Sequence, residues 1–194
     1  EDIYLGGAKG QAGALYLQHV DGKFVLQQNP IFEQLKMAED VVAEFIDLNR
    51  DGFLDLYVGS GGNESISGEV FNFDRVFIND GKGNLRFSMN SLPPIGENTS
   101  TIAFHDVNGD GAIDIFVGSS VVTGNYGAKP RSYLLINDGK GKFIEMTPSY
   151  FGEDFRPGMV QRALWNDING DGENELILTG EWMPVVVYRK QSDG

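Results

Sequence analysis

The sequence predicts an all-β protein built from repeats of a four-stranded antiparallel sheet. Three nonapeptides share one pattern: DLNRDGFLD at 47–55, DVNGDGAID at 106–114 and DINGDGENE at 167–175, which begin 59 and 61 residues apart. A second marker, a glycine-containing turn that ends in phenylalanine, closes at Phe24, Phe87 and Phe143. Two markers with a similar period indicate an internal repeat, and the β-branched and aromatic residues between them favour strands.

The chain opens inside a repeat. Residues 1–6, EDIYLG, match the segment that ends the first nonapeptide and follows it, LDLYVG at 54–59. Asp2 therefore takes the ninth position of a nonapeptide whose earlier residues are missing. We expect the chain to be cut from a longer protein, in which any signal peptide would lie upstream.

The second repeat predicts four strands, at residues 41–46, 54–59, 75–79 and 84–89. Apolar residues alternate along the first of these strands, at Ala43 and Phe45. Such alternation turns one face of a strand toward the gap between neighbouring sheets. The same positions in the later repeats are Ile102, Phe104, Ala163 and Trp165.

A single four-stranded sheet leaves both faces in need of cover, and copies arranged around an axis supply it. Four strands per repeat is the unit of a propeller blade, whereas helical solenoids are excluded by the missing 3.6-residue periodicity. We therefore predict that residues 1–194 form a partial β-propeller of about three four-stranded blades, with loops between the first and second strands. An incomplete first blade (second to fourth strands) spans 1–30, full blades span 38–90 and 98–147, and an incomplete fourth spans 159–194.

Each nonapeptide carries oxygen-rich side chains at regular positions. Asp, Asn and Asp occupy positions one, three and five, glycine occupies position six, and Asp or Glu occupies position nine. These oxygens, with the backbone carbonyl of position seven, can converge on a hard cation, and Ca²⁺ accepts such a flexible cage more readily than Mg²⁺. The glycines at position six, Gly52, Gly111 and Gly172, are expected to adopt positive φ.

The nonapeptides have two alternative interpretations. An EF-hand needs a glutamate at position twelve and flanking helices, but Val58, Val117 and Leu178 stand there, within predicted strands. Metal-free turns stabilised by Asp and Asn side chains are the second alternative. Three or four carboxylates in each loop would repel one another without a cation, which favours the metal site.

The pattern D-x-N-x-D-G-x-x-D, followed by an aliphatic strand and a glycine, resembles the FG-GAP and VCBS repeats of integrin-α-like propellers. The run TGEWMP at 179–184, followed by VVVY, is similar to bacterial surface proteins whose propeller precedes an ASPIC/UnbV domain. This resemblance implies one calcium ion in each loop, about three in all, about seven blades in the parent protein, and an extracytoplasmic location: secreted, periplasmic or on the cell surface. The ligands it implies are Asp47, Asn49, Asp51, Phe53 and Asp55; Asp106, Asn108, Asp110, Ala112 and Asp114; and Asp167, Asn169, Asp171, Glu173 and Glu175.

Two departures from this pattern bear on the calcium prediction. Glu175 is longer than aspartate by one methylene, which puts the geometry of the third site in question. Arg50 replaces the glycine that stands at position four of the other two loops, and its charge is expected to weaken the first site.

Composition narrows the class of partner. The formal net charge is -13, with no run of Lys or Arg, which excludes nucleic acid as a partner. No apolar run reaches the length of a membrane span. His19 and His105 are the only histidines, and we interpret both as structural; no catalytic motif is present and no catalytic residue is predicted.

A protein or carbohydrate ligand is expected on the face opposite the nonapeptides, where the longer loops gather. The remaining blades of the parent protein are also expected to contact this segment. Alternatively, two copies of the chain are expected to associate through their open sheet edges. The alternative is a calcium-dependent polysaccharide-acting enzyme, such as a lyase, whose cleavage would depend on Lys129 or Arg131. Aromatic and basic residues of the long loops are Phe71, Phe73, Tyr126, Lys129, Arg131, Tyr150, Phe155, Arg156 and Trp182.

Overall fold

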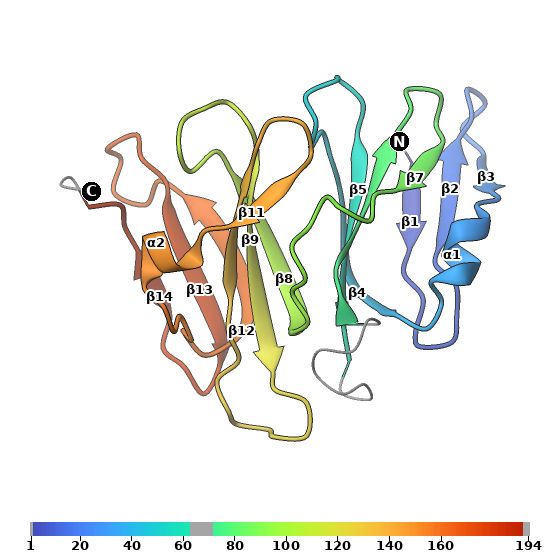
Figure 1. Cartoon of the computed structure of the whole chain (residues 1–194). Helices are drawn as coiled ribbons and strands as arrows, with labels where there is room; N and C mark the ends of the chain where they lie inside the picture. The colour runs from blue at the N-terminus through green and yellow to red at the C-terminus, as the bar shows by residue number, and fades with distance from the viewer. Residues whose placement is uncertain (1, 63–71, 192–194) are drawn as a thin grey trace.

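The computed structural model describes residues 2–62 and 72–191, which form four antiparallel sheets placed side by side (Figure 1). The first sheet contains β1 (Ile3–Leu5), β2 (Ala14–Gln18) and β3 (Phe24–Gln27), and the second contains β4 (Glu39–Ile46), β5 (Asp55–Gly61), β6 (Arg75–Asn79) and β7 (Leu85–Phe87). The third contains β8 (Asn98–His105), β9 (Asp114–Val121), β10 (Tyr133–Asn137) and β11 (Phe143–Glu145). The fourth contains β12 (Met159–Asn166), β13 (Glu175–Glu181) and β14 (Val186–Tyr188).

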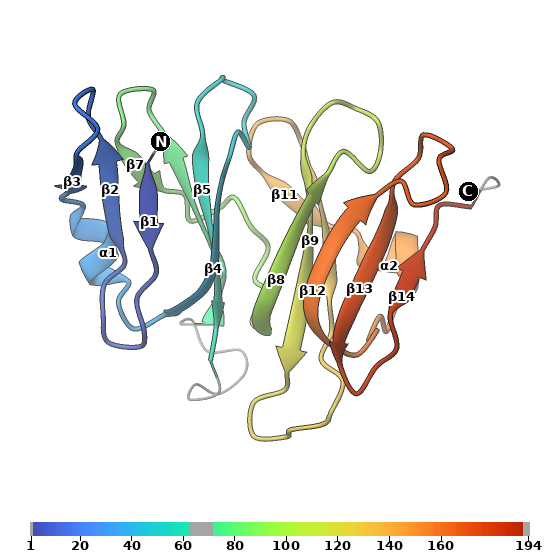
Figure 2. The same ribbon diagram turned by 180° about the vertical axis from the view of Figure 1, so that it is seen from behind.

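Within each sheet the strands are hydrogen-bonded in sequence order, so every sheet is a meander. The predicted all-β class and the antiparallel sheets are therefore confirmed. The first strands of the last three sheets, β4, β8 and β12, lie next to one another on one side of the molecule (Figure 2). β8 packs against β4 and β5 of the second sheet, and β12 packs against β8 and β9 of the third.

Two five-residue helices were not predicted from the sequence. α1 (Pro30–Gln34) begins after Asn29, whose side chain accepts a hydrogen bond from the N–H of Ile31, and it buries Phe32 between the first two sheets. α2 (Thr147–Phe151) follows β11, and Thr147 Oγ1 accepts a hydrogen bond from the Leu134 N–H of β10 at 2.9 Å. Both helices lie in connections between sheets, where they cover apolar side chains.

Apolar side chains fill each gap between neighbouring sheets. Phe45 of β4 packs into the gap between the first and second sheets, and Phe104 and Trp165 take the same place in the next two gaps. The predicted orientation of these residues is confirmed. Burying a large apolar side chain contributes about 1.5–3 kcal/mol, so three such gaps supply most of the hydrophobic stabilisation.

The connections sort to two ends of the molecule. The three nonapeptide loops, which join the first and second strands, and the short turns between third and fourth strands lie at the upper end in Figure 1. We call this the aspartate-loop end. The loop between β9 and β10 lies at the opposite, lower end, which we call the long-loop end. The β9–β10 loop thus lies opposite the nonapeptide loops, as predicted.

A buried polar cluster lies below the apolar core of the second sheet. Arg75 Nη2 donates to Asp40 Oδ1 at 2.6 Å, and both side chains are nearly excluded from solvent. Asp74 accepts hydrogen bonds from Tyr57 Oη at 2.5 Å, from the Ser60 N–H at 2.8 Å and from Thr99 Oγ1 at 2.9 Å. Burial raises the pKa of Asp74 to about 6 despite these donors.

The raised pKa of Asp74 predicts a specific pH dependence. Between about pH 4 and 6 the folded protein holds a proton that the unfolded chain releases, so the stability contributed by Asp74 is lost as pH rises through 6. The wild type should therefore lose up to about 3 kcal/mol of its free energy of unfolding between pH 4 and pH 7, measured as the difference from the Asp74→Asn variant at each pH. Urea unfolding of both proteins across this range measures the difference, and a difference independent of pH would contradict the assignment.

Candidate functional site

The three nonapeptide loops have one hydrogen-bonding pattern, set by the aspartate at position one. Asp47 Oδ1 accepts from the N–H groups of Arg50 and Asp51 at 2.7 and 3.2 Å, and Asp47 Oδ2 accepts from the Gly52 N–H at 2.9 Å. Asp106 and Asp167 make the same three bonds, at 2.7–3.2 Å. Position one therefore folds each loop around its own carboxylate.

Positions three to seven continue this pattern. Asn49 Oδ1 accepts from the Asp51 N–H at 3.0 Å, and Asp51 Oδ1 accepts from the Phe53 N–H at 2.9 Å. The second loop repeats these bonds with Asn108, Asp110 and Ala112, and the third with Asn169, Asp171 and Glu173. Positions one, three, five and seven are thus brought together in all three loops.

Glycine at position six has positive φ in every loop, as predicted: 87° at Gly52, 83° at Gly111 and 91° at Gly172. Position four also requires positive φ. Two loops have glycine there, but Arg50 adopts φ 63°, a conformation that costs a residue with a Cβ about 1–2 kcal/mol.

The carboxylate at position nine has a different role. Asp114 is fully buried; its Oδ2 accepts from the Val107 N–H of its own loop, and its Oδ1 accepts from the Asn137 N–H of β10, both at 2.9 Å. Asp55 bonds Leu48 and Asn79 in the same way. Burial raises the pKa of both carboxyl groups. The negative charges of the carboxylates at positions one and five raise it further.

Position two was missed by the sequence reasoning. Leu48 is fully buried in the core between the second and third sheets, where its carbonyl accepts a hydrogen bond from Asn137 Nδ2 at 2.8 Å. Val107 is partly buried in the next gap, whereas Ile168 is 53% exposed. The signal was present, because all three loops have an aliphatic residue there.

Comparison with known families identifies this repeat. Residues 47–117, from the first loop to the strand after the second, match the FG-GAP-like repeat. Residues 47–117 therefore have the sequence of an FG-GAP-like repeat. The match does not include residues 179–184, so the association with an ASPIC/UnbV domain stays a prediction. A search of curated proteins finds no match to this chain.

The third nonapeptide loop, which lies outside the matched residues, differs from the first two. Asn169 Nδ2 donates to Glu175 Oε1 at 2.7 Å, whereas Asn49 and Asn108 donate to the aspartate at position five. Arg189 places its guanidinium 2.5 Å from Asp171 Oδ2 and 3.8 Å from Glu175 Oε1. A basic side chain thus approaches two of the predicted ligands of this loop.

Arg50 does not lie over the loop to which it belongs. Its Nη1 donates to the Asp110 carbonyl of the second FG-GAP loop at 3.4 Å. The pKa of Asp110 is lowered, mainly by hydrogen bonds from Ala112 and Asn108, and the charge of Arg50 adds to this effect. The guanidinium of Arg50 thus lies at the second loop, and its expected effect on the first site stays a prediction.

The loops provide the oxygen atoms that Ca²⁺ prefers, and the assignment of these residues as calcium ligands stays a prediction. Within residues 2–62 and 72–191, no three histidine, aspartate or glutamate side chains gather as a metal site would require. The carboxylates at positions one and five instead accept loop N–H groups. Asp47 Oδ2 accepts a single N–H group and so keeps a second lone pair, which makes the hydrogen bonds of the loop compatible with a cation.

The aromatic residues predicted to bind a ligand do not lie on one surface. Tyr126 and Trp182 meet edge to face at the long-loop end, with ring centroids 5.3 Å apart, and are 61% and 76% exposed. Phe155 is instead buried between the third and fourth sheets. Tyr150 lies beside Glu173 and Asn174 at the aspartate-loop end, which corrects its placement. Phe71 lies outside the described residues.

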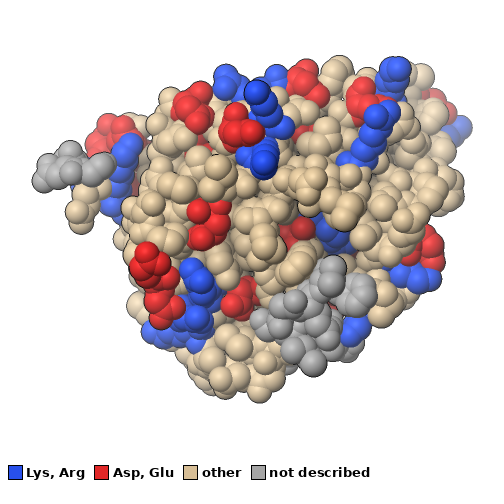
Figure 3. Space-filling view, viewed as in Figure 1, with Lys and Arg blue, Asp and Glu red and all other residues tan. Residues whose placement is uncertain are grey.

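The basic residues of the long loops make local contacts. Arg156 Nη1 donates to the Lys129 carbonyl at 3.0 Å, and the guanidinium of Arg131 lies 5.3 Å from the centre of the Tyr133 ring. Figure 3 shows basic side chains interspersed with acidic ones on the face seen there. Among the described residues, no helix has the length and apolar character needed to cross a bilayer.

Proposed function

We propose that this chain is a non-catalytic binding scaffold of the β-propeller type, stabilised by calcium and located outside the cytoplasm. The observation that supports calcium most directly is the fully buried carboxylate at position nine of the first two loops, close to two further carboxylates of the same loop. A divalent cation would relieve this repulsion. Extracellular calcium modules bind at about 10⁻⁴–10⁻³ M, which suits an exposed loop.

The first two loops are proposed as the stronger calcium sites. Among the described residues, no Lys or Arg side chain forms an ion pair with a carboxylate of these loops, whereas Arg189 pairs with Asp171 in the third. A bound guanidinium competes with a cation for the same oxygens. We therefore expect two tighter sites and a weaker third one.

Calcium is expected to raise the stability of the chain. Each site should contribute about 2.7 kcal/mol when the free ion is at 100 times its dissociation constant. Thermal unfolding in calcium, in magnesium and in chelator measures the shift, and isothermal titration calorimetry counts the ions. Arg189→Ala should strengthen the third site, while Arg86→Ala, which removes an arginine that pairs with Asp80 outside the loops, should not. Identical unfolding in calcium and in chelator would refute the calcium proposal.

The exposed pair Tyr126 and Trp182 is proposed as the ligand-binding surface. Trp182 adopts φ 52°, an uncommon conformation for a non-glycine residue, and its ring lies against Gly127, where a Cβ would come within 2.7 Å of it. Tyr126 Oη donates to Glu181. Two held aromatic rings beside a carboxylate suit a sugar, which offers C–H groups to the rings and hydroxyls to the acid.

A panel of immobilised oligosaccharides tests this surface. Trp182→Ala is expected to weaken binding at least tenfold, because the largest exposed ring of the pair is lost. Tyr150→Ala is the matched control, since it removes an exposed aromatic ring at the opposite end. Equal losses in the two variants would place the ligand elsewhere.

A further inference from the structure

A carboxylate lies beside the exposed aromatic pair of the long-loop end. Tyr126 in the β9–β10 connection and Trp182 in the β13–β14 connection meet at an interplanar angle of 81°, so the two rings form a corner. Glu181, the last residue of β13, holds its carboxylate at this corner: Oε2 accepts a hydrogen bond from Tyr126 Oη, and Oε1 accepts one from Gln161 Nε2 at 3.4 Å. A negative charge is thus fixed next to two aromatic rings.

Glu181 has no cationic partner of its own. Among the described residues, its carboxylate forms no ion pair with Lys, Arg or His. The pKa of Tyr126 is raised, first by the hydrogen bond to Glu181 and also by the charge of that carboxylate. The formal net charge of -13 adds a negative field over the whole chain. A positively charged ligand group would therefore be attracted to Glu181 without having to displace a basic side chain.

The basic residues of the neighbouring loops have other contacts. The guanidinium of Arg131 lies 5.3 Å from the centre of the Tyr133 ring, and Arg156 Nε donates to Asp154 Oδ1 at 2.6 Å. Lys129 stands three residues after the tyrosine of the pair, in the same loop. An anionic sugar would need this lysine, whereas a cationic sugar would not, so Lys129 separates the two classes of ligand.

Exposed aromatic faces attract cations as well as the C–H groups of sugars. Both side chains of the pair are largely exposed. An ammonium group within about 6 Å of a ring centre is attracted to the face of the ring, and tryptophan gives the strongest attraction. A carboxylate adds a charge-assisted hydrogen bond, which is roughly twice as strong as a neutral one. One ammonium group beside Trp182 and Glu181 gains both attractions.

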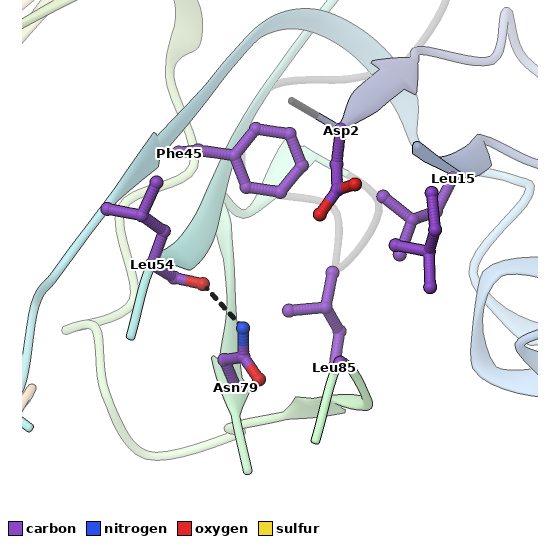
Figure 4. A pocket seen from close by; sticks show the side chains of 8 residues that line it. Asp2, Leu15, Phe45, Leu54, Asn79 and Leu85 are labelled. Carbon is purple, nitrogen blue, oxygen red and sulfur yellow. Dashed lines mark hydrogen bonds between the residues drawn. The ribbon is translucent and has the colours of Figure 1, made fainter. Parts of the chain in front are cut away.

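The cavity at the aspartate-loop end lacks this combination. It has a volume of about 380 Å³, and Figure 4 shows the Asp2 carboxylate there between Phe45 and Leu15. Among the described residues that line it, Phe45 alone is aromatic, and its ring packs into the gap between the first two sheets. The aromatic corner at the long-loop end is therefore the better place for a cation.

We propose that Tyr126, Glu181 and Trp182 bind an amino sugar whose amine is free and protonated. The C–H groups of the sugar ring lie on the face of Trp182, and the ammonium group donates hydrogen bonds to Glu181. The ligand is then a polysaccharide with unacetylated amines. The assignment of an amine rests on the sugar-binding surface proposed above.

Two oligosaccharides of equal length test the amine: a glucosamine hexamer, and the same hexamer with every amine acetylated. Isothermal titration calorimetry with the full chain compares them at about pH 6, where the amine is protonated and carboxylates are ionised. The wild type should bind the acetylated hexamer about tenfold more weakly, because acetylation removes the positive charge and keeps the sugar ring.

Glu181→Gln should remove this preference. Glutamine keeps an acceptor for Tyr126 Oη but not the charge, so the glucosamine hexamer should bind about tenfold more weakly while the acetylated hexamer binds as before. Glu33→Gln is the matched control, because it removes the same charge from an exposed pair with Lys36 in α1. Lys129→Ala should not weaken the binding of either hexamer.

Four results would overturn the proposal. Equal affinity for the two hexamers, or equal weakening of both by Glu181→Gln, would exclude the amine and leave the sugar-binding surface in place. A lysine hexamer that binds as tightly as the glucosamine hexamer would show recognition of charge without a sugar. Tighter binding of an acidic oligosaccharide, lost in Lys129→Ala, would assign the opposite charge to the ligand. Absence of binding to every one of these sugars would overturn both the amine and the surface.

Discussion

Replacing Asp114 by alanine is expected to lower the free energy of unfolding by about 2–6 kcal/mol. Asp114 is fully buried and accepts hydrogen bonds from the N–H groups of Val107 and Asn137. Truncation leaves both N–H groups in the interior without an acceptor, and each such group costs about 1–3 kcal/mol. Urea unfolding at neutral pH in chelator measures the loss free of any calcium contribution.

Asp138 provides the matched control for this variant. Its Oδ1 also accepts two backbone hydrogen bonds, from Lys140 and Lys142, but it lies in the exposed turn before β11. Water replaces a lost acceptor there, so Asp138→Ala should cost about 1 kcal/mol or less. A similar loss in both variants would show that burial does not set the importance of the position-nine carboxylate.

Leu48→Ala is expected to lower the free energy of unfolding by about 2–5 kcal/mol. The Leu48 side chain is fully buried between the second and third sheets, and its removal leaves a cavity that the rigid strands around it cannot close. The size of the loss thus measures how tightly the two sheets are packed at their aspartate-loop end. Differential scanning calorimetry or urea unfolding gives the value.

Ile168 holds the same loop position in the fourth sheet but is 53% exposed. Ile168→Ala should therefore cost less than about 1 kcal/mol, since little apolar surface is returned to water. If both variants lost the same stability, position two would act within its own loop and not between sheets.

Much of the fold follows from local features of the sequence. Loop positions one to six need only short-range hydrogen bonds and a glycine with positive φ, so three similar nonapeptides predicted three similar turns. The alternating apolar residues of β4, β8 and β12 predicted which faces are buried, because side chains alternate along any strand. The two short helices were missed, since five residues carry too little periodicity to be recognised.

Contacts between sheets could not be predicted in the same way. Arg50 reaches Asp110 of the next loop, because stacking of the sheets brings together segments far apart in the sequence. Tyr126 and Trp182 meet for the same reason. Within the fourth sheet, Arg189 approaches Asp171 from the residue after β14.

The sequence by itself determined the repeat, the all-β class and the loop chemistry, since each depends on residues close together in the chain. Tertiary structure alone decided which loop carboxylates are buried, which are approached by a guanidinium, and where two exposed aromatic rings meet beside a carboxylate. These features depend on which sheet covers which, and burial and charge pairing act through space between residues that local patterns do not connect.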